Sequence, residues 1–547
     1  MGRETGEETR SIWMATPLPR FAALDGDRQV DVAVIGAGIT GITTALLLKR
    51  QGRRVAVIEA AEVGSGETSR TSAHLTAVLD GGLSRLVSRF GGDNAIVAVR
   101  AHQAAIDWID TTARTLGIDC DFRRVPGFLY CDDEVCRPDG ENGRALLDAE
   151  LEAAHALGME ARRVPGAPLP FATGPALRFE NQAQFHPRRY LRGLVDALVS
   201  DGSVVFERTR VLSVEDGEPC RVETERGTIT ANAVVVASHV PVINKLFLHT
   251  KLEPMRSYLL AISTGQPHPD GLFWDLATPY HYWRSVRIDG QDLMLVGGAD
   301  HKVGATEDTE GAFRDLEAYV RQRLGRAMVA ARWSGQIIEP VDGLAYVGRN
   351  SMSTHVFVAT GYSGNGLTGA TAAAMILCDE VGGSAHPWSD LFAATRVKPV
   401  AGARAFVRQN ASAARHLVAD RFRTLTPDVV ADLPAGGGQV VEYKGERLAV
   451  YREPTGALRA LSAVCTHLGC LVGWNNAEQS WDCPCHGSRY APDGAVINGP
   501  AVKALERRDL ATLLAEESAR ANQEREAESE REAAGDLTAD PSTVPAG

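Results

Sequence analysis

Residues 30–60, VDVAVIGAGITGITTALLLKRQGRRVAVIEA, decide the fold of the N-terminal part of the chain. An apolar strand, VAVI, leads through Gly36, Gly38 and Gly41 into an amphipathic helix, and a second VAVI strand ends at Glu59. The order strand, G-x-G-x-x-G, helix, strand, acid is typical of a dinucleotide-binding unit. Its glycines allow a tight turn, close approach of backbone to a pyrophosphate, and close helix–strand packing. Glu59 would accept hydrogen bonds from a ribose, which argues against a 2′-phosphate.

Composition sets outer limits on fold and function. The chain has 547 residues, 44% hydrophobic and 23% charged, which favours a soluble protein of about two to four domains. The net charge is −12, and residues 516–547 carry nine acids against three arginines. The basic residues are dispersed, which argues against a nucleic-acid surface. The sequence shows neither a membrane-spanning apolar run nor the apolar core of a secretory signal, so we expect no membrane span and a cytoplasmic location.

A second decisive stretch, residues 465–490, reads CTHLGCLVGWNNAEQSWDCPCHGSRY. It holds a C-x-H pair, Cys465 and His467, and a C-x-x-H pair, Cys483 and His486. Two cysteines and two histidines can bind zinc, but a zinc finger places paired cysteines before paired histidines. The alternation seen here is typical of a Rieske [2Fe-2S] centre, in which two cysteines hold one iron and two histidines the other. These four side chains are therefore the predicted metal ligands.

The flanks of this stretch resemble Rieske proteins, including those of cytochrome bc complexes. The resemblance implies that Cys470 and Cys485 form a disulfide between the two cluster loops, although disulfides are uncommon in the cytoplasm. It also implies that the hydroxyl groups of Ser488 and Tyr490 favour the reduced cluster, which places its potential in the upper half of about −150 to +300 mV. The other cysteines show no ligand spacing and are expected to be ordinary thiols: Cys120, Cys131, Cys136, Cys220 and Cys378.

The preceding part, residues 28–385, resembles the D-amino-acid-oxidase and glycine-oxidase group of FAD-dependent oxidoreductases. The resemblance lies in the fingerprint and in four later motifs: GSGETSRTSAHLT (64–76), ANAVVVASHVP (231–241), RWSGQIIEPVDGLAYVG (332–348) and VFVATGYSGNGLTG (356–369). The order of these motifs is more specific than any one of them. It implies a Rossmann-like FAD domain assembled from discontinuous segments, with an interleaved substrate domain built on an antiparallel sheet.

The segment GNGLTG at residues 364–369 is a second formal match to the glycine fingerprint. It lacks the acid about 20 residues later that a second dinucleotide site would need, so we expect both segments to touch one FAD. The resemblance puts the start of its helix at the flavin, where the helix dipole stabilises negative charge. The FAD-binding residues that it implies are Gly36, Gly38, Ile39, Gly41, Glu59, Thr68, Ser69, Thr71, His74, Val211, Ala237, Gly361, Gly364, Gly366, Leu367 and Thr368.

FAD is expected to be held without a covalent bond. Thr71 stands where some relatives bear a histidine bonded to the flavin, and SGQIIEPVDG lacks the cysteine that sarcosine oxidases use. His74 is near, but its offset differs. We interpret it as a residue that lines the site, with a covalent link as the alternative.

The predicted fold class is therefore α/β and α+β with a small all-β domain. Residues 28–390 form the FAD-dependent part, 391–427 a helical connector, 428–513 the Rieske domain, and 514–547 an acidic tail in which a short solvated helix is followed by disorder. Turn sequences KGE and EPTG separate short β-rich runs in the Rieske domain. The connector sequence is amphipathic, so the two redox modules could be held in a fixed relation.

Together the two cofactors predict a converter, because FAD takes two electrons and a Rieske cluster takes one. We expect an enzyme that dehydrogenates a carbon–nitrogen bond of an amino acid or of a secondary or tertiary amine. The imine is then hydrolysed, and reduced FAD passes electrons singly to the cluster and on to an external protein or quinone acceptor. The oligomeric state stays open.

The catalytic candidates come from the middle segment of the chain: Tyr258, Tyr280, Arg284 and His301. Arg284 could pair with a substrate carboxylate or could be structural. The aromatic residues, Trp274 among them, could enclose an amine cation or could be core. His301 could be functional or a hydrogen-bonded core histidine.

Three other functions can be compared with the sequence. A flavin and iron–sulfur relay or sensor would use the same cofactors without turning over a metabolite. An NADH-dependent reductase would need a second nucleotide site, for which GNGLTG is the only candidate. A Rieske oxygenase would need a mononuclear iron on two histidines and a carboxylate, and the sequence shows no such cluster outside the assigned segment.

Overall fold

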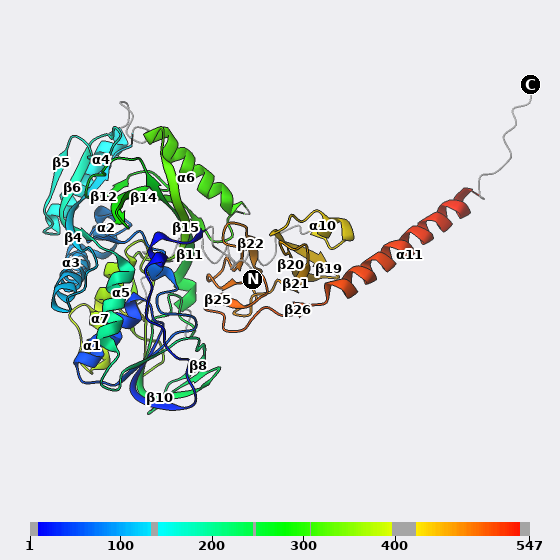
Figure 1. Cartoon of the computed structure of the whole chain (residues 1–547), viewed down its shortest axis with the longest axis horizontal. Helices are drawn as coiled ribbons and strands as arrows, with labels where there is room; N and C mark the ends of the chain where they lie inside the picture. The colour runs from blue at the N-terminus through cyan, green and yellow to red at the C-terminus, as the bar shows by residue number, and fades with distance from the viewer. Residues whose placement is uncertain (1–8, 133–140, 244–247, 307, 397–422, 537–547) are drawn as a thin grey trace, which may run out of the picture.

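The computed structural model describes residues 9–132, 141–243, 248–306, 308–396 and 423–536. Two large sheets form the body of the molecule, and two small sheets extend from one side of it (Figure 1). Each large sheet takes strands from several separate parts of the chain. The predicted mixed fold, with two interleaved subdomains and a small all-β domain, is confirmed.

The first large sheet has eight strands and carries the glycine fingerprint. Its central order is β16-β17-β10-β1-β2-β7, with parallel pairing from β17 to β7, and Ile35 lies level with both Ile58 and Val236. The inner strands are apolar throughout because both faces of a parallel sheet are covered. The strands are β1 (Arg28–Ile35), β2 (Val55–Ile58), β7 (Val204–Phe206), β8 (Val211–Glu215), β9 (Cys220–Thr224), β10 (Gly227–Val236), β16 (Tyr346–Arg349) and β17 (Val356–Thr360).

The helices of the FAD-dependent part pack around α1, which follows the fingerprint. α1 contacts α5 and α7, while α3 contacts α7 and α2, and α4 contacts α2. Buried side chains of these helices join one core with β1 and β2. The helices are α1 (Ile39–Arg50), α2 (Leu83–Phe90), α3 (Gly92–Thr115), α4 (Glu141–Ala156), α5 (Pro187–Leu198), α7 (Gly366–Val381) and α8 (Ser389–Phe392), with 3-10 turns η2 (Ile12–Ala15), η3 (Glu67–Ser69) and η4 (Leu248–Lys251).

The second large sheet has nine strands and one parallel pair, β4 with β12. Its main order is β15-β11-β14-β13-β12-β4-β6-β3, and β5 pairs with β6. Helix α6 (Thr309–Leu324) packs on β11 and β14. The strands are β3 (His74–Leu75), β4 (Arg123–Tyr130), β5 (Ala161–Val164), β6 (Ala176–Gln184), β11 (Leu252–Ser263), β12 (Leu272–Asp275), β13 (Tyr282–Ile288), β14 (Gln291–Lys302) and β15 (Met328–Pro340).

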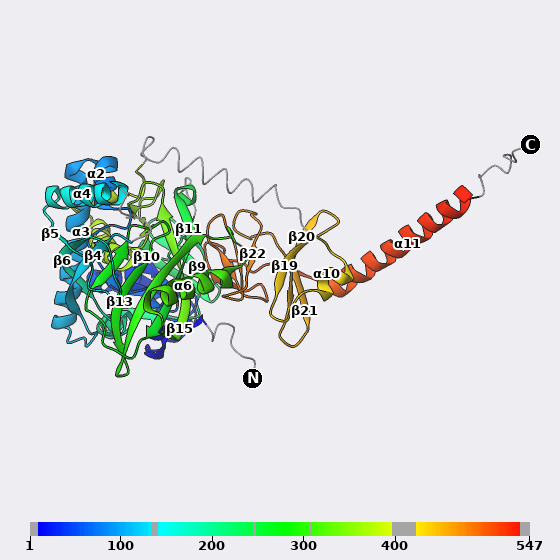
Figure 2. The same ribbon diagram turned by 90° about the horizontal axis from the view of Figure 1, so that it is seen from above.

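The C-terminal domain has two small antiparallel sheets, which we call inner and outer. The inner sheet lies between the body and the outer sheet in both views (Figures 1 and 2). The inner sheet contains β22 (Gly473–Asn475), β23 (Ser480–Asp482), β24 (Arg489–Tyr490) and β25 (Val496–Asn498). The outer sheet contains β18 (Arg423–Thr424), β19 (Gly438–Tyr443), β20 (Glu446–Arg452), β21 (Leu458–Ser462) and β26 (Arg507–Arg508), of which β18 pairs parallel to β19.

The acidic tail differs from the expectation of a short helix followed by disorder. Helix α11 (Leu510–Asp536) continues from the outer sheet and points away from the rest of the chain (Figure 1). Its sequence is rich in Ala, Glu and Arg, which are strong helix formers. The tail beyond Asp536, and residues 397–422 of the predicted connector, lie outside the described residues; a short helix, α10 (Pro427–Ala431), begins at the connector's end. Within the described ranges, no helix combines the length and apolar character needed to span a bilayer.

Candidate functional site

A cavity of about 820 Å³ is lined by three parts of the chain that are distant in sequence. The carboxyl ends of β1 and β2 supply one wall, and strands β11, β12, β13 and β15 supply another. The third part is the C-terminal domain, which contributes Ile497, Asn498, Gly499 and Val502. The glycine fingerprint and the predicted Rieske domain therefore face the same cavity.

The turn after β1 accepts only glycine at two positions. Gly36 has φ +104°, and an added Cβ would come within 2.5 Å of the carbonyl oxygen of Ala237. A Cβ on Gly41 would lie 1.9 Å from the carbonyl oxygen of Gly36. This close packing leaves the N-terminus of α1, with its backbone donors, open to the cavity, which is the geometry of a pyrophosphate site.

Glu59 and Thr68 complete this end of the cavity. The Glu59 carboxylate accepts from the backbone N–H groups of Ala37 and Ala61, both at 2.9 Å, and burial raises the pKa of Glu59 despite these donors. Thr68 Oγ1 accepts from the N–H of Ile39 at 3.0 Å, which ties the loop at residues 64–76 to the start of α1. Both side chains thus line the cavity beside the fingerprint.

The second glycine segment lies at the other end of the cavity, as a helix start rather than a second fingerprint. Asp80 accepts from Gly364 N–H at 3.1 Å, and Asn365 Oδ1 accepts from Asp80 N–H at 2.8 Å. Thr368 of α7 is buried, and its Oγ1 lies 2.8 Å from Nδ1 of His102 in α3. The positive end of the α7 dipole therefore faces the cavity through Gly366 and its neighbours.

Most predicted FAD-binding residues line this one cavity. Those that do are Gly36, Gly38, Ile39, Glu59, Thr68, Thr71, His74, Val211, Ala237, Gly364, Gly366 and Leu367. Four others support the walls from behind: Gly41, Ser69, Gly361 and Thr368. Ser69, for example, accepts from Arg188 Nη1 at 2.9 Å and so holds the loop rather than facing the cavity.

Aromatic and acidic side chains gather at the end of the cavity that faces the nine-stranded sheet. Tyr280, Tyr282, Trp274 and Asp80 line it, and the Tyr282 hydroxyl lies 2.9 Å from Ser257 Oγ. Burial raises the pKa of Asp80 and of both tyrosines. The sequence predicts Tyr280 and Trp274 as candidates but not Asp80 and Tyr282, because it does not tell which side chains are turned to the cavity.

Of the predicted catalytic residues, only Tyr280 lines the cavity. Tyr258 and His301 lie on the opposite face of the sheet, where the Tyr258 hydroxyl contacts His301 Nε2 at 2.9 Å and its ring packs on Phe313 of α6. Arg284 is buried beside the cavity wall, with Nη1 donating to backbone carbonyls including that of Ala73 at 2.7 Å. The hypothesis that Arg284 binds a carboxylate therefore gives way to its structural alternative.

His74 lines the cavity as a neutral side chain. Burial lowers its pKa to about 3, its Nδ1 lies 2.9 Å from Ser72 Oγ, and its ring meets Tyr282 edge-on. Nε2 is buried without a partner among the described residues. An imidazole with one free nitrogen is suited to contact a bound cofactor or substrate.

The four predicted metal ligands meet on two loops of the C-terminal domain. The rings of His467 and His486 are 5.0 Å apart, and burial lowers their pKa values to about 3 and about 4. A hydrogen bond with the Cys483 thiol lowers the pKa of Cys465 to about 6, and the hydrogen bond with Tyr490 adds to this shift. Neutral imidazole and thiolate are the forms that bind metal.

The disulfide predicted between the cluster loops is confirmed: Cys470 is bonded to Cys485. Their sulfur atoms and that of Cys483 lie within 4.8 Å of one another, but the bonded pair cannot act as thiolate ligands. Tyr490 contacts Cys465 Sγ at 3.1 Å, as the resemblance implies. Cys131 is also in a disulfide, which corrects its assignment as a thiol; Cys120, Cys220 and Cys378 are buried thiols, as expected, and Cys136 lies outside the described residues.

Comparison with protein families decides the class of this protein. A family described as FAD dependent oxidoreductase matches residues 31–380, and one described as Rieske [2Fe-2S] domain matches residues 427–512. The chain belongs to the FAD-dependent oxidoreductase family. Its cofactors are FAD and a Rieske [2Fe-2S] cluster.

Two relatives of this FAD-dependent oxidoreductase differ in how much they share with it. YhfW of Bacillus subtilis (strain 168), named as a Rieske 2Fe-2S iron-sulfur protein, is 34% identical over 509 residues, covering 92% of this chain and 98% of YhfW. Gamma-glutamylputrescine oxidoreductase of Escherichia coli (strain K12) is 25% identical over 426 residues, covering 73% of this chain and 94% of the relative. The first similarity spans both domains.

Among solved structures, glycine oxidase from Geobacillus kaustophilus has a similar fold. The TM-score is 0.57 at 20% identity, over 68% of this chain and all of glycine oxidase. L-proline dehydrogenase from P. horikoshii gives 0.55 at 18% identity, over 67% and 96% of the two chains. Both likenesses concern the fold.

The side chains of this oxidoreductase fit both cofactors. For FAD, the fit lies in the fingerprint turn, where a Cβ on Gly36 or Gly41 would fill the space that the backbone needs. For the cluster, it lies in the imidazoles of His467 and His486, which carry buried nitrogens without partners among the described residues. Bound FAD would supply a two-electron acceptor and the cluster a one-electron acceptor.

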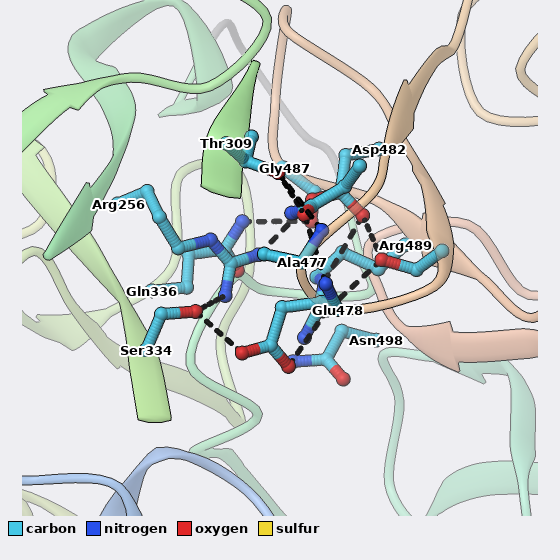
Figure 3. A network of polar contacts seen from close by, with 12 residues as sticks. Arg256, Thr309, Ser334, Gln336, Ala477, Glu478, Asp482, Gly487, Arg489 and Asn498 are labelled. Carbon is cyan, nitrogen blue, oxygen red and sulfur yellow. Dashed lines mark hydrogen bonds and ion pairs between the residues drawn. The ribbon is translucent and has the colours of Figure 1, made fainter. Parts of the chain in front are cut away.

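A buried polar network attaches the Rieske domain to the FAD-dependent part (Figure 3). Arg256 of β11 donates to Asp482 at 3.1 Å, and Arg489 donates to the other oxygen of Asp482 at 3.1 Å. Glu478 accepts from Ser334 at 2.6 Å and pairs with Arg70 at 3.1 Å. Burial would raise the pKa of Asp482, but the two arginines lower it to about 2.

The same interface reaches the cofactor loop. Glu67 of η3 accepts from the N–H of Gln336 at 2.7 Å, and the amide of Asn498 lies 3.5 Å from its other oxygen. The Gln336 side chain of β15 donates to the carbonyl of Gly487 at 3.1 Å. Gly487 directly follows His486 in the chain, so this hydrogen bond joins β15 to a ligand-bearing loop. None of these contacts could be predicted from the sequence, because they join segments that are more than 100 residues apart.

Proposed function

We propose that the chain is an FAD-dependent dehydrogenase that oxidises a carbon–nitrogen bond of an amine or amino acid and passes the electrons singly, through its own Rieske cluster, to an external acceptor. The substrate loses two hydrogens as two electrons, which FAD takes up, and two protons to give an imine, which water converts to a carbonyl compound and ammonia or an amine. The observation that carries the proposal is the shared cavity, which is lined both by Asn498 and Gly499 of the Rieske domain and by the glycine fingerprint.

The polar network supports a fixed relation between the two cofactor sites. Arg256, Asp482 and Arg489 are each less than 5% exposed, so the charges depend on one another for stabilisation. Moving the Rieske domain away would break the ion pairs Arg256–Asp482 and Arg70–Glu478, whose carboxylates are buried. We infer that the cluster receives electrons in this arrangement, without a large domain movement.

The substrate end of the cavity favours a cationic nitrogen. Asp80 offers a carboxylate, and Tyr280 and Tyr282 offer aromatic rings. Both kinds of group stabilise an ammonium group. The arginine expected to pair with a carboxylate is instead held by backbone carbonyls. The buried site also excludes water from the reacting carbon, and holding the substrate there supplies much of the rate enhancement.

An anaerobic screen of amines and amino acids tests this function. Flavin absorbance and the paramagnetic signal of the reduced cluster are followed together in the full-length protein. The proposal expects both signals to respond to at least one amine. Bleaching by NADH alone would point to a reductase, and no response across the panel would point to a relay or sensor.

A variant sharpens the same screen. Asp80→Asn removes the carboxylate but keeps a hydrogen-bonding side chain at the same place. We expect KM for an active amine to rise at least tenfold, because a charged contact is worth more than a neutral one. An unchanged KM would remove Asp80 from substrate binding.

A further inference from the structure

His249 connects the FAD-dependent part to the ligand histidines of the cluster. It lies in η4, and its ring centroid is 4.8 Å from that of His467 and 5.6 Å from that of His486. The side chain is 1% exposed. A buried histidine from one domain therefore contacts both ligand histidines of the other.

The hydrogen bond that His249 makes defines what its free nitrogen can do. Nε2 lies 2.8 Å from the carbonyl oxygen of Pro241. A carbonyl only accepts, so Nε2 carries the proton and Nδ1 is left with a lone pair. Nδ1 is buried and has no partner among the described residues.

The neighbouring histidines offer the matching donor. Both ring nitrogens of His467 are buried without a partner in the described part of the chain, and so is Nδ1 of His486. An imidazole that binds iron through one nitrogen keeps an N–H on the other, and such N–H groups are nearly always paired. An unpaired acceptor and an unpaired donor in one enclosed contact would each carry a desolvation cost.

We propose that His249 is a positioning residue of the Rieske cluster, whose Nδ1 accepts a hydrogen bond from the ring N–H of a ligand histidine, His467 being the nearer. Accepting this bond makes the ligand more electron-donating and so favours the oxidised cluster. It also fixes the orientation of the ligand ring.

The same residue marks a short protein path to the FAD cavity. Val240 and Val242 line the cavity, and Pro241 between them holds His249 through its carbonyl. A Cβ on Gly499 would lie 3.3 Å from Val242, so the two domains are in contact at this point. This second part of the inference rests on the proposed function, whereas the effect on the cluster does not.

Three variants of the full-length holoprotein test the hydrogen bond. His249→Phe keeps a ring for packing but removes the acceptor, His249→Leu removes both, and His249→Asn keeps a carbonyl that can accept. His268→Phe is the matched control, since His268 is half-buried and contacts Thr264 instead of a ligand histidine. The measurement is a redox titration of the cluster followed by its paramagnetic signal, which needs no substrate.

We expect His249→Phe to raise the midpoint potential by about 59 mV, a tenfold change in the ratio of reduced to oxidised cluster at fixed potential. His249→Asn should lie closer to the unsubstituted protein, and His268→Phe should match it. Loss of the cluster from both apolar variants, with retention in His249→Asn, would equally support an acceptor. An unchanged potential in either apolar variant with a full cluster, or cluster loss in all three, would overturn the proposal.

A second measurement separates this inference from the proposed function. The bound flavin is reduced by light with EDTA as donor, and reduction of the cluster is timed. If the unsubstituted protein transfers no electrons, the proposed function fails, while a shifted midpoint in His249→Phe would still establish the hydrogen bond. If transfer occurs, we expect it to be at least tenfold slower in His249→Leu, and an equal rate would overturn the path through His249.

Discussion

The inner and outer sheets of the Rieske domain differ in what they contact. The inner sheet carries Asp482 and Arg489, which are buried with Arg256 of the FAD-dependent part. On the outer side, the exposed pair Lys444 and Glu516 joins the turn after β19 to α11. Buried pairs of charge specify one geometry, whereas exposed pairs contribute little. The half of the domain that holds the cluster is therefore the half whose position is fixed.

Removing one charge from the buried network of the inner sheet should have the largest effect on stability. Arg256→Met leaves Asp482 with one of its two arginines, in a buried site. We expect the free energy of unfolding to fall by about 3 to 5 kcal/mol, since breaking a buried ion pair by removing one partner is costly. Denaturant unfolding, followed by flavin fluorescence, measures the loss.

The matched control lies in the outer half. Lys444→Met removes one partner of the exposed pair with Glu516 and should leave the unfolding midpoint within error. Equal destabilisation by the two substitutions would contradict the idea that docking energy is concentrated at the inner sheet.

The disulfide is the next largest contribution to the inner half. Cys470 and Cys485 are 15 residues apart in sequence and join the two loops that carry the ligands. Replacing both by serine should cost about 3 kcal/mol, because the unfolded loop is no longer closed. Heating with the cluster signal as probe should show the cluster lost at a lower temperature than the flavin. Simultaneous loss of both would mean that the loops do not melt separately.

Acid should weaken the contact between the inner sheet and the FAD-dependent part within a defined range of pH. The pKa of Asp482 is lowered to about 2, against about 3.9 in an unfolded chain, so its contribution is complete above pH about 4 and is lost as the pH falls toward 2. The shift corresponds to about 2 to 3 kcal/mol. Unfolding measured from pH 2 to 6 should show this slope. Asp482→Asn should flatten it, and an unchanged slope in that variant would assign the acid sensitivity to other groups.

The smallest expected effect is at the cluster itself. Tyr490 lies 3.1 Å from Cys465 Sγ and can donate to the thiolate. Tyr490→Phe should disfavour the reduced cluster by about 1 kcal/mol, the net contribution of one hydrogen bond, and so lower the midpoint potential. A redox titration measures this, and it should move in the direction opposite to His249→Phe. A shift of both in one direction would contradict the assigned roles.

The nucleotide end and the cluster ligands could be predicted from the sequence because each depends on neighbours in the chain. Gly36, Gly41 and Glu59 lie in one strand–helix–strand unit, whose spacing fixes their positions. The ligand pairs likewise lie on two short loops. Local geometry of this kind leaves few alternatives.

The substrate end could not be predicted because it depends on which face of a strand is turned inward. Ser257 and Leu259 line the cavity, and Tyr258 between them points to the other face. A change of one residue in register would exchange the two sets. Arg284 shares the face of Tyr282 but lies two residues further along β13, beyond the cavity wall. His249 gave no signal, because its partners come from another domain.

Transfer of electrons within one chain is the central claim, and its concentration dependence tests it most directly. The bound flavin is reduced anaerobically by light, and the rate at which the cluster signal appears is measured over a hundredfold range of protein concentration. The account predicts a single rate that is independent of concentration, because the Rieske domain of the same chain contributes Asn498 and Gly499 to the wall of the FAD cavity. A rate proportional to concentration, or a flavin that stays reduced beside an oxidised cluster, would contradict it.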